Sequence, residues 1–184
     1  VTGVQTCALP ISLNELLDAC EKLKGAGITP ISAGNYDMIM RYPAFKAFRM
    51  EGNDFIDNAR MGKKKFDSET GIASGEFFQQ IAQYYNEGWT NSDATAQMDL
   101  FLNKGAAILY TGTWDTPDLT DENMVLKDDI SMFKLPMDTD NDATTENDYY
   151  AHCGIGTAIL KDSMTPAMKD FIKYLWENFA DTAR

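Results

Sequence analysis

The chain has 184 residues, of which 16 are Lys or Arg and 28 are Asp or Glu, so its formal net charge is −12. This acidic balance argues against nucleic acid and against an anionic membrane surface as partners. Hydrophobic residues make up 44% of the chain, enough for the packed core of one domain, or of one lobe and part of another. No apolar run approaches the ~20 residues that a membrane-spanning helix needs.

Residues 1–11 are expected to be a non-native leader. They back-translate codon for codon into a common sequencing-adapter primer, and Ser12 straddles the junction. Such a segment is excluded from fold reasoning, as a processing scar would be. We therefore expect the natural N-terminus, with any signal peptide or lipid-attachment cysteine, to precede this sequence.

Apart from Cys7 in the leader, the chain carries two cysteines, Cys20 and Cys153. They lie far apart in the sequence and have no metal-like spacing. The spacing favours two unpaired, half-buried thiols and leaves a single bridge between them open.

Helices and short apolar strands alternate along the chain, which is typical of the α/β class. Apolar residues at helical spacing, followed by glycine, indicate the helices, and short apolar runs beside turn residues indicate the strands. In chain order the predicted elements are a helix over 12–25, a strand over 28–33, short helices and irregular structure over 38–65, helices over 74–88 and 92–104, strands over 106–110 and 130–136, an acidic solvated loop over 137–148, a strand over 156–160 and a helix from 165 onward.

The starts of three helices carry recognisable signals. Ser12 and Glu15 match a capping box. Ser74 is predicted to cap the helix whose apolar stripe ends before Gly88. Pro166 is predicted at the first position of the last helix, where its missing N–H costs nothing.

Trp114 is the first candidate ligand-binding residue. The strand predicted over 106–110 breaks at Thr111-Gly112-Thr113 and presents Trp114 immediately afterwards. A strand that ends in a small-residue turn carrying a large aromatic residue often forms the floor of a ligand cleft in α/β domains. A core tryptophan beside a tight turn is the alternative. Asp115 could accept hydrogen bonds from ligand hydroxyls, or it could cap a following helix.

Asn35, Tyr36 and Asp37 form the second candidate group, because they follow the strand predicted over 28–33. Asn and Asp side chains can bind a pair of hydroxyls, and Tyr36 would offer a second aromatic platform. Ordinary turn chemistry is the alternative explanation for this composition.

The sequence gives no support for catalysis, a cofactor or a metal site. The acidic run that begins at Asp138 fails the calcium-loop pattern, since Ala143 replaces the required glycine and Tyr149 the bidentate glutamate. His152 is the single histidine, which excludes a multi-histidine metal site. The segment 154–156 is too short and wrongly placed for a dinucleotide fingerprint, and neither a nucleophile elbow nor a CxxC pair occurs.

Five motifs recur in the order found in a known family. They are the helix-then-strand segment 12–31, the block 101–114 with its glycine and its terminal G-x-W, the strand 133–136, the strand 153–161 and the helix 167–175. Their joint order resembles the extracellular solute-binding proteins of ABC importers, in the sugar-binding, maltose-binding-protein-like family. The resemblance covers almost all of residues 12–175.

This resemblance implies a type II periplasmic-binding-protein-like fold of two lobes that close on a ligand by a hinge. Residues 12–135 would form most of the C-terminal lobe, and residues 136–184 would be a segment returning to the N-terminal lobe. The fold is expected to be incomplete, so the chain is expected to bind ligand poorly by itself.

The resemblance also implies roles for individual residues. Trp114 matches a position that stacks on a sugar ring, and an aromatic face suits the C–H groups of a pyranose. Tyr150 and His152 lie on an approach that often faces the cleft in this family. A lone histidine is, however, more often a surface or interface residue than a ligand-binding group.

The function implied is capture of a sugar or oligosaccharide and its delivery to an ABC permease, by a monomer without enzymatic activity. The expected location is extracellular, as a cell-surface lipoprotein or in the periplasm. Two alternatives stay open: a secreted glycan-active enzyme or carbohydrate-binding module, and the ligand-sensing domain of a receptor kinase.

Overall fold

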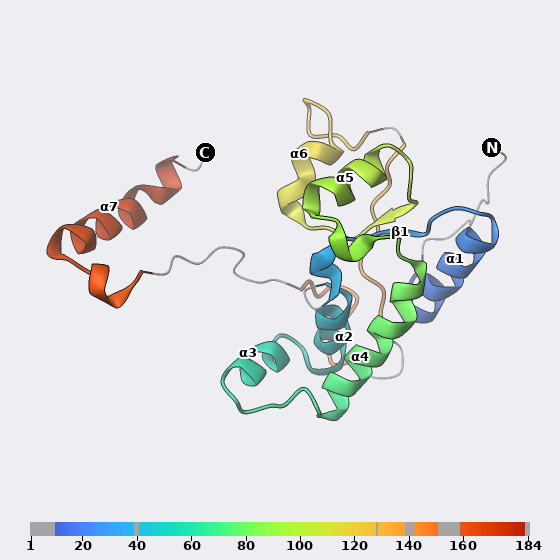
Figure 1. Ribbon diagram of the computed structural model, residues 1–184, viewed down its shortest axis with the longest axis horizontal. Coiled ribbons are helices and arrows are strands. Elements are labelled where there is room, and N and C mark those ends of the chain that lie inside the picture. The colour runs from blue at the N-terminus through green and yellow to red at the C-terminus, as the bar shows by residue number, and fades with distance from the viewer. Residues whose placement is uncertain (1–9, 39–40, 128, 139–141, 151–158, 183–184) are drawn as a thin grey trace. The chain divides into compact units, whose positions relative to one another are not determined.

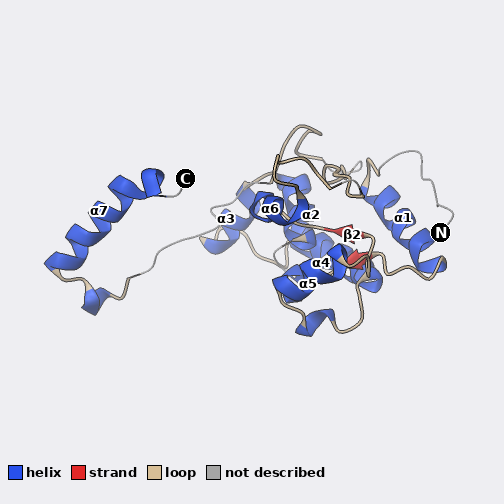
Figure 2. Cartoon of the chain, turned by 90° about the horizontal axis from the view of Figure 1, so that it is seen from above, coloured by secondary structure: helices blue, strands red, loops and turns tan. Residues whose placement is uncertain are grey.

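The computed structural model describes residues 10–38, 41–127, 129–138, 142–150 and 159–182 of the chain. The chain divides into two compact units, Val1–Tyr150 and Ala151–Arg184. In the first unit, helices surround a pair of short strands (Figure 1, Figure 2). The α/β class predicted from the sequence is confirmed, with more helix and less strand than expected.

The first unit begins with a helix and brings its two strands together from distant parts of the sequence. Its described elements are α1 (Leu13–Gly25), β1 (Ile31–Ser32), the 3-10 helix Asn35–Met38, α2 (Tyr42–Glu51), α3 (Asp54–Arg60), α4 (Glu69–Ile81), the 3-10 helices Ala82–Tyr84 and Trp89–Asn91, α5 (Ala94–Leu102), β2 (Ile108–Leu109), the 3-10 helix Thr113–Asp115 and α6 (Thr116–Leu119).

The sheet that the structure describes consists of β1 and β2, which run parallel. Ile31 pairs with Ile108, and Ser32 pairs with Leu109. The other edge of β1 is held by Asn86, whose N–H donates to the Ile31 carbonyl at 3.2 Å and whose side chain accepts from Ala33 N at 2.7 Å. β1 is therefore held from both sides although it is only two residues long.

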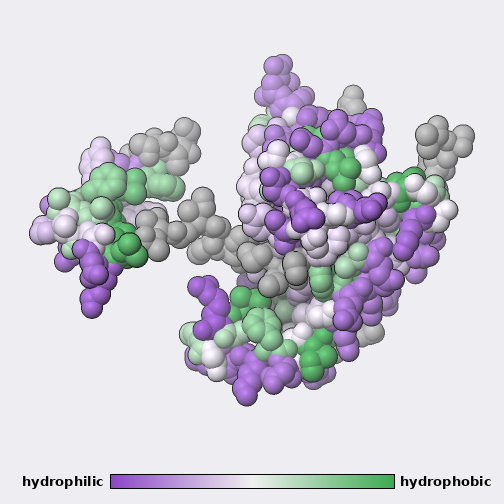
Figure 3. All heavy atoms as spheres, in the orientation of Figure 1, coloured by the Kyte–Doolittle hydropathy of each residue, from purple (hydrophilic) through white to green (hydrophobic). Residues whose placement is uncertain are grey.

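The core lies where α1, α2 and α4 meet the strands. Its buried members include Leu16, Cys20, Ile31, Tyr42, Phe45, Phe77 and Ile81. α2 packs against α4 through Tyr42 and Phe77, whose rings meet edge to face with centroids 6.5 Å apart. Hydrophilic residues lie along the side of α1 and α4 that is seen in Figure 3.

Cys20 is a free thiol in this core with no exposed surface, and burial raises its pKa from about 9 to about 12. The folded state therefore holds this proton more tightly than the unfolded chain does. The resulting stabilisation is complete below about pH 9 and is lost as the pH rises through about 12. Cys153 lies outside the described residues.

We expect Cys20 to resist alkylation in the folded protein at about pH 8, because its thiol stays protonated and the reagent cannot reach the buried sulfur. Iodoacetamide labelling followed by peptide mass spectrometry would show Cys20 unmodified in buffer and fully modified in concentrated urea without reductant. Labelling in urea only after reduction would instead show that Cys20 belongs to a disulfide.

The helices confirm the predicted periodicity, with corrected boundaries. At α1, Ser12 Oγ accepts from Glu15 N at 3.2 Å, and Glu15 Oε2 accepts from Ile11 N, so the predicted cap is present. The prediction of Ser74 as a cap is wrong. α4 begins earlier, where Ser68 Oγ accepts from Gly71 N, and Ser74 lies buried inside the helix with its hydroxyl donating to the Thr70 carbonyl.

The other boundary changes are smaller. α5 is capped by Asp93, which accepts from Ala96 N at 2.8 Å, instead of beginning at residue 92. The strands predicted over 28–33 and 106–110 are present but shorter. Residues 156–158 of the strand predicted at 156–160 lie outside the described residues, and Ile159 and Leu160 are not part of a strand.

The strand predicted over 130–136 is wrong, and the guanidinium of Arg49 binds the two main-chain carbonyls at the end of this run. Arg49 is 1% exposed in α2. It donates to the carbonyls of Leu135 at 2.9 Å and Pro136 at 3.3 Å, and also to the Thr144 hydroxyl at 2.8 Å and the Thr145 carbonyl at 2.9 Å. One side chain thereby fixes both ends of the loop that follows residue 136.

The same loop was predicted to be solvated, and most of its described residues are exposed, with Asp138 as the buried exception. Asp138 is buried and pairs with Lys46 of α2. Asp142 accepts from Asp138 N at 2.9 Å. Burial raises the pKa of Asp142, and the hydrogen bond from Asp138 N opposes the rise. The acidic run is thus attached to α2 by two basic side chains.

We expect Arg49→Met to lower the free energy of unfolding by about 2–4 kcal/mol, because it leaves several buried acceptors without their donors. Arg60→Met is the matched control, since Arg60 is 79% exposed and its pair with Asp57 at 3.9 Å is exposed too. Urea unfolding followed by circular dichroism would measure both. Equal stability of the two variants would contradict the role given to Arg49.

In the second unit, the described elements are the 3-10 helix Lys161–Ser163 and α7 (Pro166–Thr182). The predicted start of α7 is confirmed, and Thr165 Oγ1 accepts from Met168 N at 3.2 Å. The large apolar side chains of α7 are exposed within this unit. The lobe boundary predicted between residues 135 and 136 stays a prediction. No helix within the described ranges is both long and apolar enough to cross a membrane.

Candidate functional site

The parallel pairing of β1 and β2 brings two predicted ligand-binding segments to one place. The carboxyl ends of parallel strands lie at the same edge of a sheet, where α/β domains commonly bind ligands. Asn35–Met38 follows β1, and Thr113–Asp115 follows β2. Residues that are almost eighty positions apart in the sequence therefore share one edge (Figure 1).

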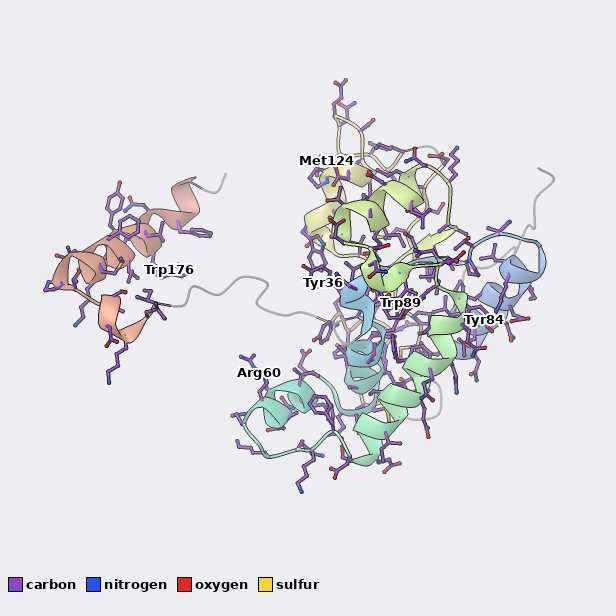
Figure 4. All side chains as sticks on the ribbon, in the orientation of Figure 1. Tyr36, Arg60, Tyr84, Trp89, Met124 and Trp176 are labelled. Atoms are coloured by element: carbon purple, nitrogen blue, oxygen red, sulfur yellow. The ribbon has the colours of Figure 1, made fainter. Side chains whose placement is uncertain are left out.

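Each segment presents an aromatic ring to solvent. Tyr36 is 54% exposed and Trp114 is 59% exposed. Tyr36 projects from the stretch between β1 and α2 (Figure 4). The alternative of a core tryptophan is wrong for Trp114, because core aromatics such as Tyr42 and Phe45 are almost fully buried.

Gly112 supports the Trp114 ring from below. A Cβ added at Gly112 would overlap the six-membered ring of Trp114. The backbone of Gly112 is extended, with φ −130° and ψ −175°, so the glycine is needed for space and not for its conformation. The small-residue turn noted in the sequence thus provides the surface on which the indole rests.

Asp115 and Asn35 hold their turns through different groups. The Asp115 carboxylate accepts from the Thr111 hydroxyl; Asp115 occupies the N-cap position of α6, but its side chain makes no hydrogen bond to that helix. Asn35 is exposed, and its N–H donates to the Ser92 carbonyl at 2.9 Å. The Asn35 side chain is left at the surface of the edge.

Asp37 lies beneath this edge and is 1% exposed. Its Oδ2 accepts from Gly34 N at 2.7 Å and from Gln97 Nε2 at 3.0 Å. Gln97 also donates to the Ser32 carbonyl, and its main-chain carbonyl accepts from the Ser32 hydroxyl. Burial raises the pKa of Asp37, while Gly34, Arg41 and Gln97 oppose the rise. Asp37 is built into the support of the loop.

Arg41 connects the two segments, and the sequence reasoning missed it. Its Nε lies 3.4 Å from Asp37 Oδ1, and its Nη1 donates to the Tyr110 carbonyl at the end of β2. Its guanidinium also lies 6.0 Å from the centroid of the Tyr110 ring. The spacing of four residues between Asp37 and Arg41 was the available signal.

Tyr150 lies near the same strand end, on the α2 side. Its ring meets the Phe48 ring with centroids 5.7 Å apart. Burial raises the pKa of Tyr110, and the neighbouring Tyr150 phenol adds to the rise, whereas Arg41 opposes it. His152, the remaining predicted residue, lies outside the described residues.

Two hollows lie away from this edge. One of about 240 Å³ is at the amino end of β1 beside Pro30 and Asn86, and an apolar one of about 270 Å³ lies between α2, α3 and α4. Neither is lined by a predicted ligand-binding residue. Among the described residues, no group of three or more His, Cys, Asp or Glu side chains could hold a metal ion.

The family model of the bacterial extracellular solute-binding proteins matches residues 7–183. The chain belongs to this family. The resemblance inferred from the five motifs is therefore confirmed, and with it the extracellular class of the protein. No curated protein sequence matches the chain significantly.

Several solved structures share the fold. One from work on xylan utilization by the thermophilic bacterium Caldanaerobius polysaccharolyticus has 22% identity and a TM-score of 0.65, over 76% of this chain and 36% of that one. A chitin oligosaccharide binding protein has 19% identity and a TM-score of 0.63, over 73% and 35%. The bacterial solute receptor AcbH, with a preference for β-D-galactopyranose, has 13% identity and a TM-score of 0.61, over 73% and 35%.

These matches confirm the solute-binding-protein fold for part of such a protein. The chain spans about a third of the length of the solved solute-binding proteins it matches.

We expect Gly112→Ala to displace the Trp114 ring without unfolding the protein, because alanine tolerates the extended backbone but its Cβ overlaps the indole. Fluorine NMR of 5-fluorotryptophan-labelled protein should show the Trp114 resonance shifted and those of Trp89 and Trp176 unchanged. Gly75→Ala is the control, since a Cβ there meets nothing within 4 Å. That helical substitution should stabilise the protein by about 0.5–1 kcal/mol and shift no tryptophan resonance.

Proposed function

We propose that the protein is the substrate-binding component of an ABC transporter and that it binds a sugar or oligosaccharide at the shared edge of β1 and β2. The observation that carries this proposal is the pair of exposed rings, Tyr36 and Trp114, at the carboxyl ends of two adjacent parallel strands. Membership of the solute-binding family supports it, as do the carbohydrates named for the structures that share the fold.

The chemistry of the edge suits a carbohydrate. Aromatic faces combine apolar contact with a weakly negative π-surface, which matches the C–H groups of a pyranose ring. Asn35 and Asp115 stand next to the two rings and supply groups that can hydrogen-bond to sugar hydroxyls. Asp37 acts from beneath as a support, because its oxygens are buried and Oδ2 already accepts two hydrogen bonds.

The remaining parts of the proposal concern the whole protein. Residues 12–135 belong to the C-terminal lobe and residues 136–184 return to the N-terminal lobe, with Tyr150 and His152 on the approach to the cleft. Closure of the lobes seals the ligand, and the closed protein delivers it to the permease. The protein works as a monomer outside the cytoplasm, as a surface lipoprotein or in the periplasm, and binding requires no chemical step.

We expect Trp114→Ala to weaken sugar binding by about 1–3 kcal/mol, the scale of one lost stacking and burial contact. Isothermal titration calorimetry of the full-length protein against a panel of mono- and oligosaccharides would first identify the ligand. The matched control is Phe66→Ala, which removes a similarly exposed ring from the stretch between α3 and α4.

The control variant should bind as tightly as the unmodified protein. A full-length protein that binds no saccharide in the panel, but binds a peptide or an anion instead, would contradict the proposed ligand class. Equal affinity of the Trp114→Ala and Phe66→Ala variants would remove Trp114 from the site.

A further inference from the structure

Arg41 lies between the two segments that carry the exposed rings. Asp37, which its Nε faces at 3.4 Å, is the neighbour of Tyr36 in the sequence. The Tyr110 carbonyl, which accepts from its Nη1, immediately precedes the Thr111–Gly112 turn on which Trp114 rests. One guanidinium therefore contacts the base of both segments.

The sheet by itself gives these segments little constraint. The paired residues end at Ser32 and Leu109, so neither ring-bearing segment belongs to the ladder. The first segment is held by Gly34 N and Gln97 on Asp37 and by Asn35 N on the Ser92 carbonyl. The second is held by the Thr111 hydroxyl on Asp115. These bonds shape each turn, and none of them joins one ring-bearing segment to the other.

Arg41 is suited to that task by its chemistry and its burial. A guanidinium is planar and carries five donors in a rigid fork, so it can face a carboxylate and a carbonyl at once. The Arg41 side chain is 13% exposed, and its guanidinium lies 6.0 Å from the centroid of the Tyr110 ring. Its position at the start of α2, which packs in the core, anchors the bridge to the rigid part of the unit.

We propose that Arg41 is a positioning residue that sets the separation between the Tyr36 and Trp114 rings, and thereby tunes ligand affinity without contacting the ligand. The effect on affinity rests on the proposed sugar-binding function. The effect on separation does not, because it is a property of the ligand-free protein.

Arg41→Met and Arg41→Lys test the two contacts differently. Methionine removes both of them. Lysine keeps a positive charge beside Asp37, but its single ammonium lacks the fork needed to reach the Tyr110 carbonyl as well. If the lysine variant keeps its thermal stability but shows a wider distribution of distances between the two segments, Arg41 acts as a positioning residue. A merely structural role would leave this distribution unchanged.

The experiment uses full-length protein with nitroxide labels at Tyr36→Cys and Trp114→Cys, and with every other cysteine except Cys20 replaced by serine. Cys20 is buried and stays unlabelled in the folded protein. Pulsed electron paramagnetic resonance should give one narrow distance distribution with Arg41 and a distribution at least twice as wide in both variants. In unlabelled protein, both variants should bind the identified sugar about tenfold more weakly, and Arg60→Met should bind unchanged.

Each result decides the proposal. A distribution as narrow as that of Arg41 in either folded variant would overturn it. If Arg41→Met fails to fold, the lysine variant decides alone: a wider distribution supports positioning, and an unchanged one reduces Arg41 to a charge partner of Asp37. A wider distribution in variants of a protein that binds no sugar would support the positioning role of Arg41 and contradict the proposed function.

Discussion

The parallel register of Ile31 with Ile108 and Ser32 with Leu109 is the constraint on which the candidate site depends. An antiparallel pairing would send the segments after β1 and β2 to opposite edges, and Tyr36 and Trp114 could not serve one ligand. Four paired residues are a small sheet. It holds because Asn86 occupies the far side of β1 and because α1, α2 and α4 bury Ile31 completely.

α2 connects this edge to the rest of the first unit through an arginine near each of its ends. Arg41 holds the ring-bearing segments, and Arg49 holds the loop that leads away from residue 136. Both guanidinium groups face main-chain carbonyls, which take no part in regular pairing where the strands stop. At the end of β2, Arg41 thus donates to the Tyr110 carbonyl, which lies just beyond the paired residues.

The sequence predicts the helices and the ring-bearing segments well, and the bridging side chains poorly. Apolar periodicity and helix caps are local signals, so the starts of α1 and α7 were predicted correctly. At α4 the cap was assigned to Ser74, whereas Ser68 is the residue that caps the helix. The apolar run 130–136 was expected to pair as a strand, because nothing local reveals that its last two carbonyls, of Leu135 and Pro136, accept from Arg49. Trp114 and Tyr36 follow from strand ends, whereas Arg41 acts through Tyr110, sixty-nine positions away.

The free energy that two aromatic rings can contribute to sugar binding is smaller than the free energy of a tight complex. Two stacking platforms, each giving about 1–3 kcal/mol, supply at most about 6 kcal/mol. A micromolar dissociation constant corresponds to about 8 kcal/mol, and association itself costs several more in lost translational and rotational freedom. The edge of β1 and β2 therefore needs an opposite wall of hydrogen-bonding groups to hold a sugar tightly. Under the proposed function, that wall would come from the second lobe on closure, so the pair of rings would capture the ligand loosely and the second lobe would retain it.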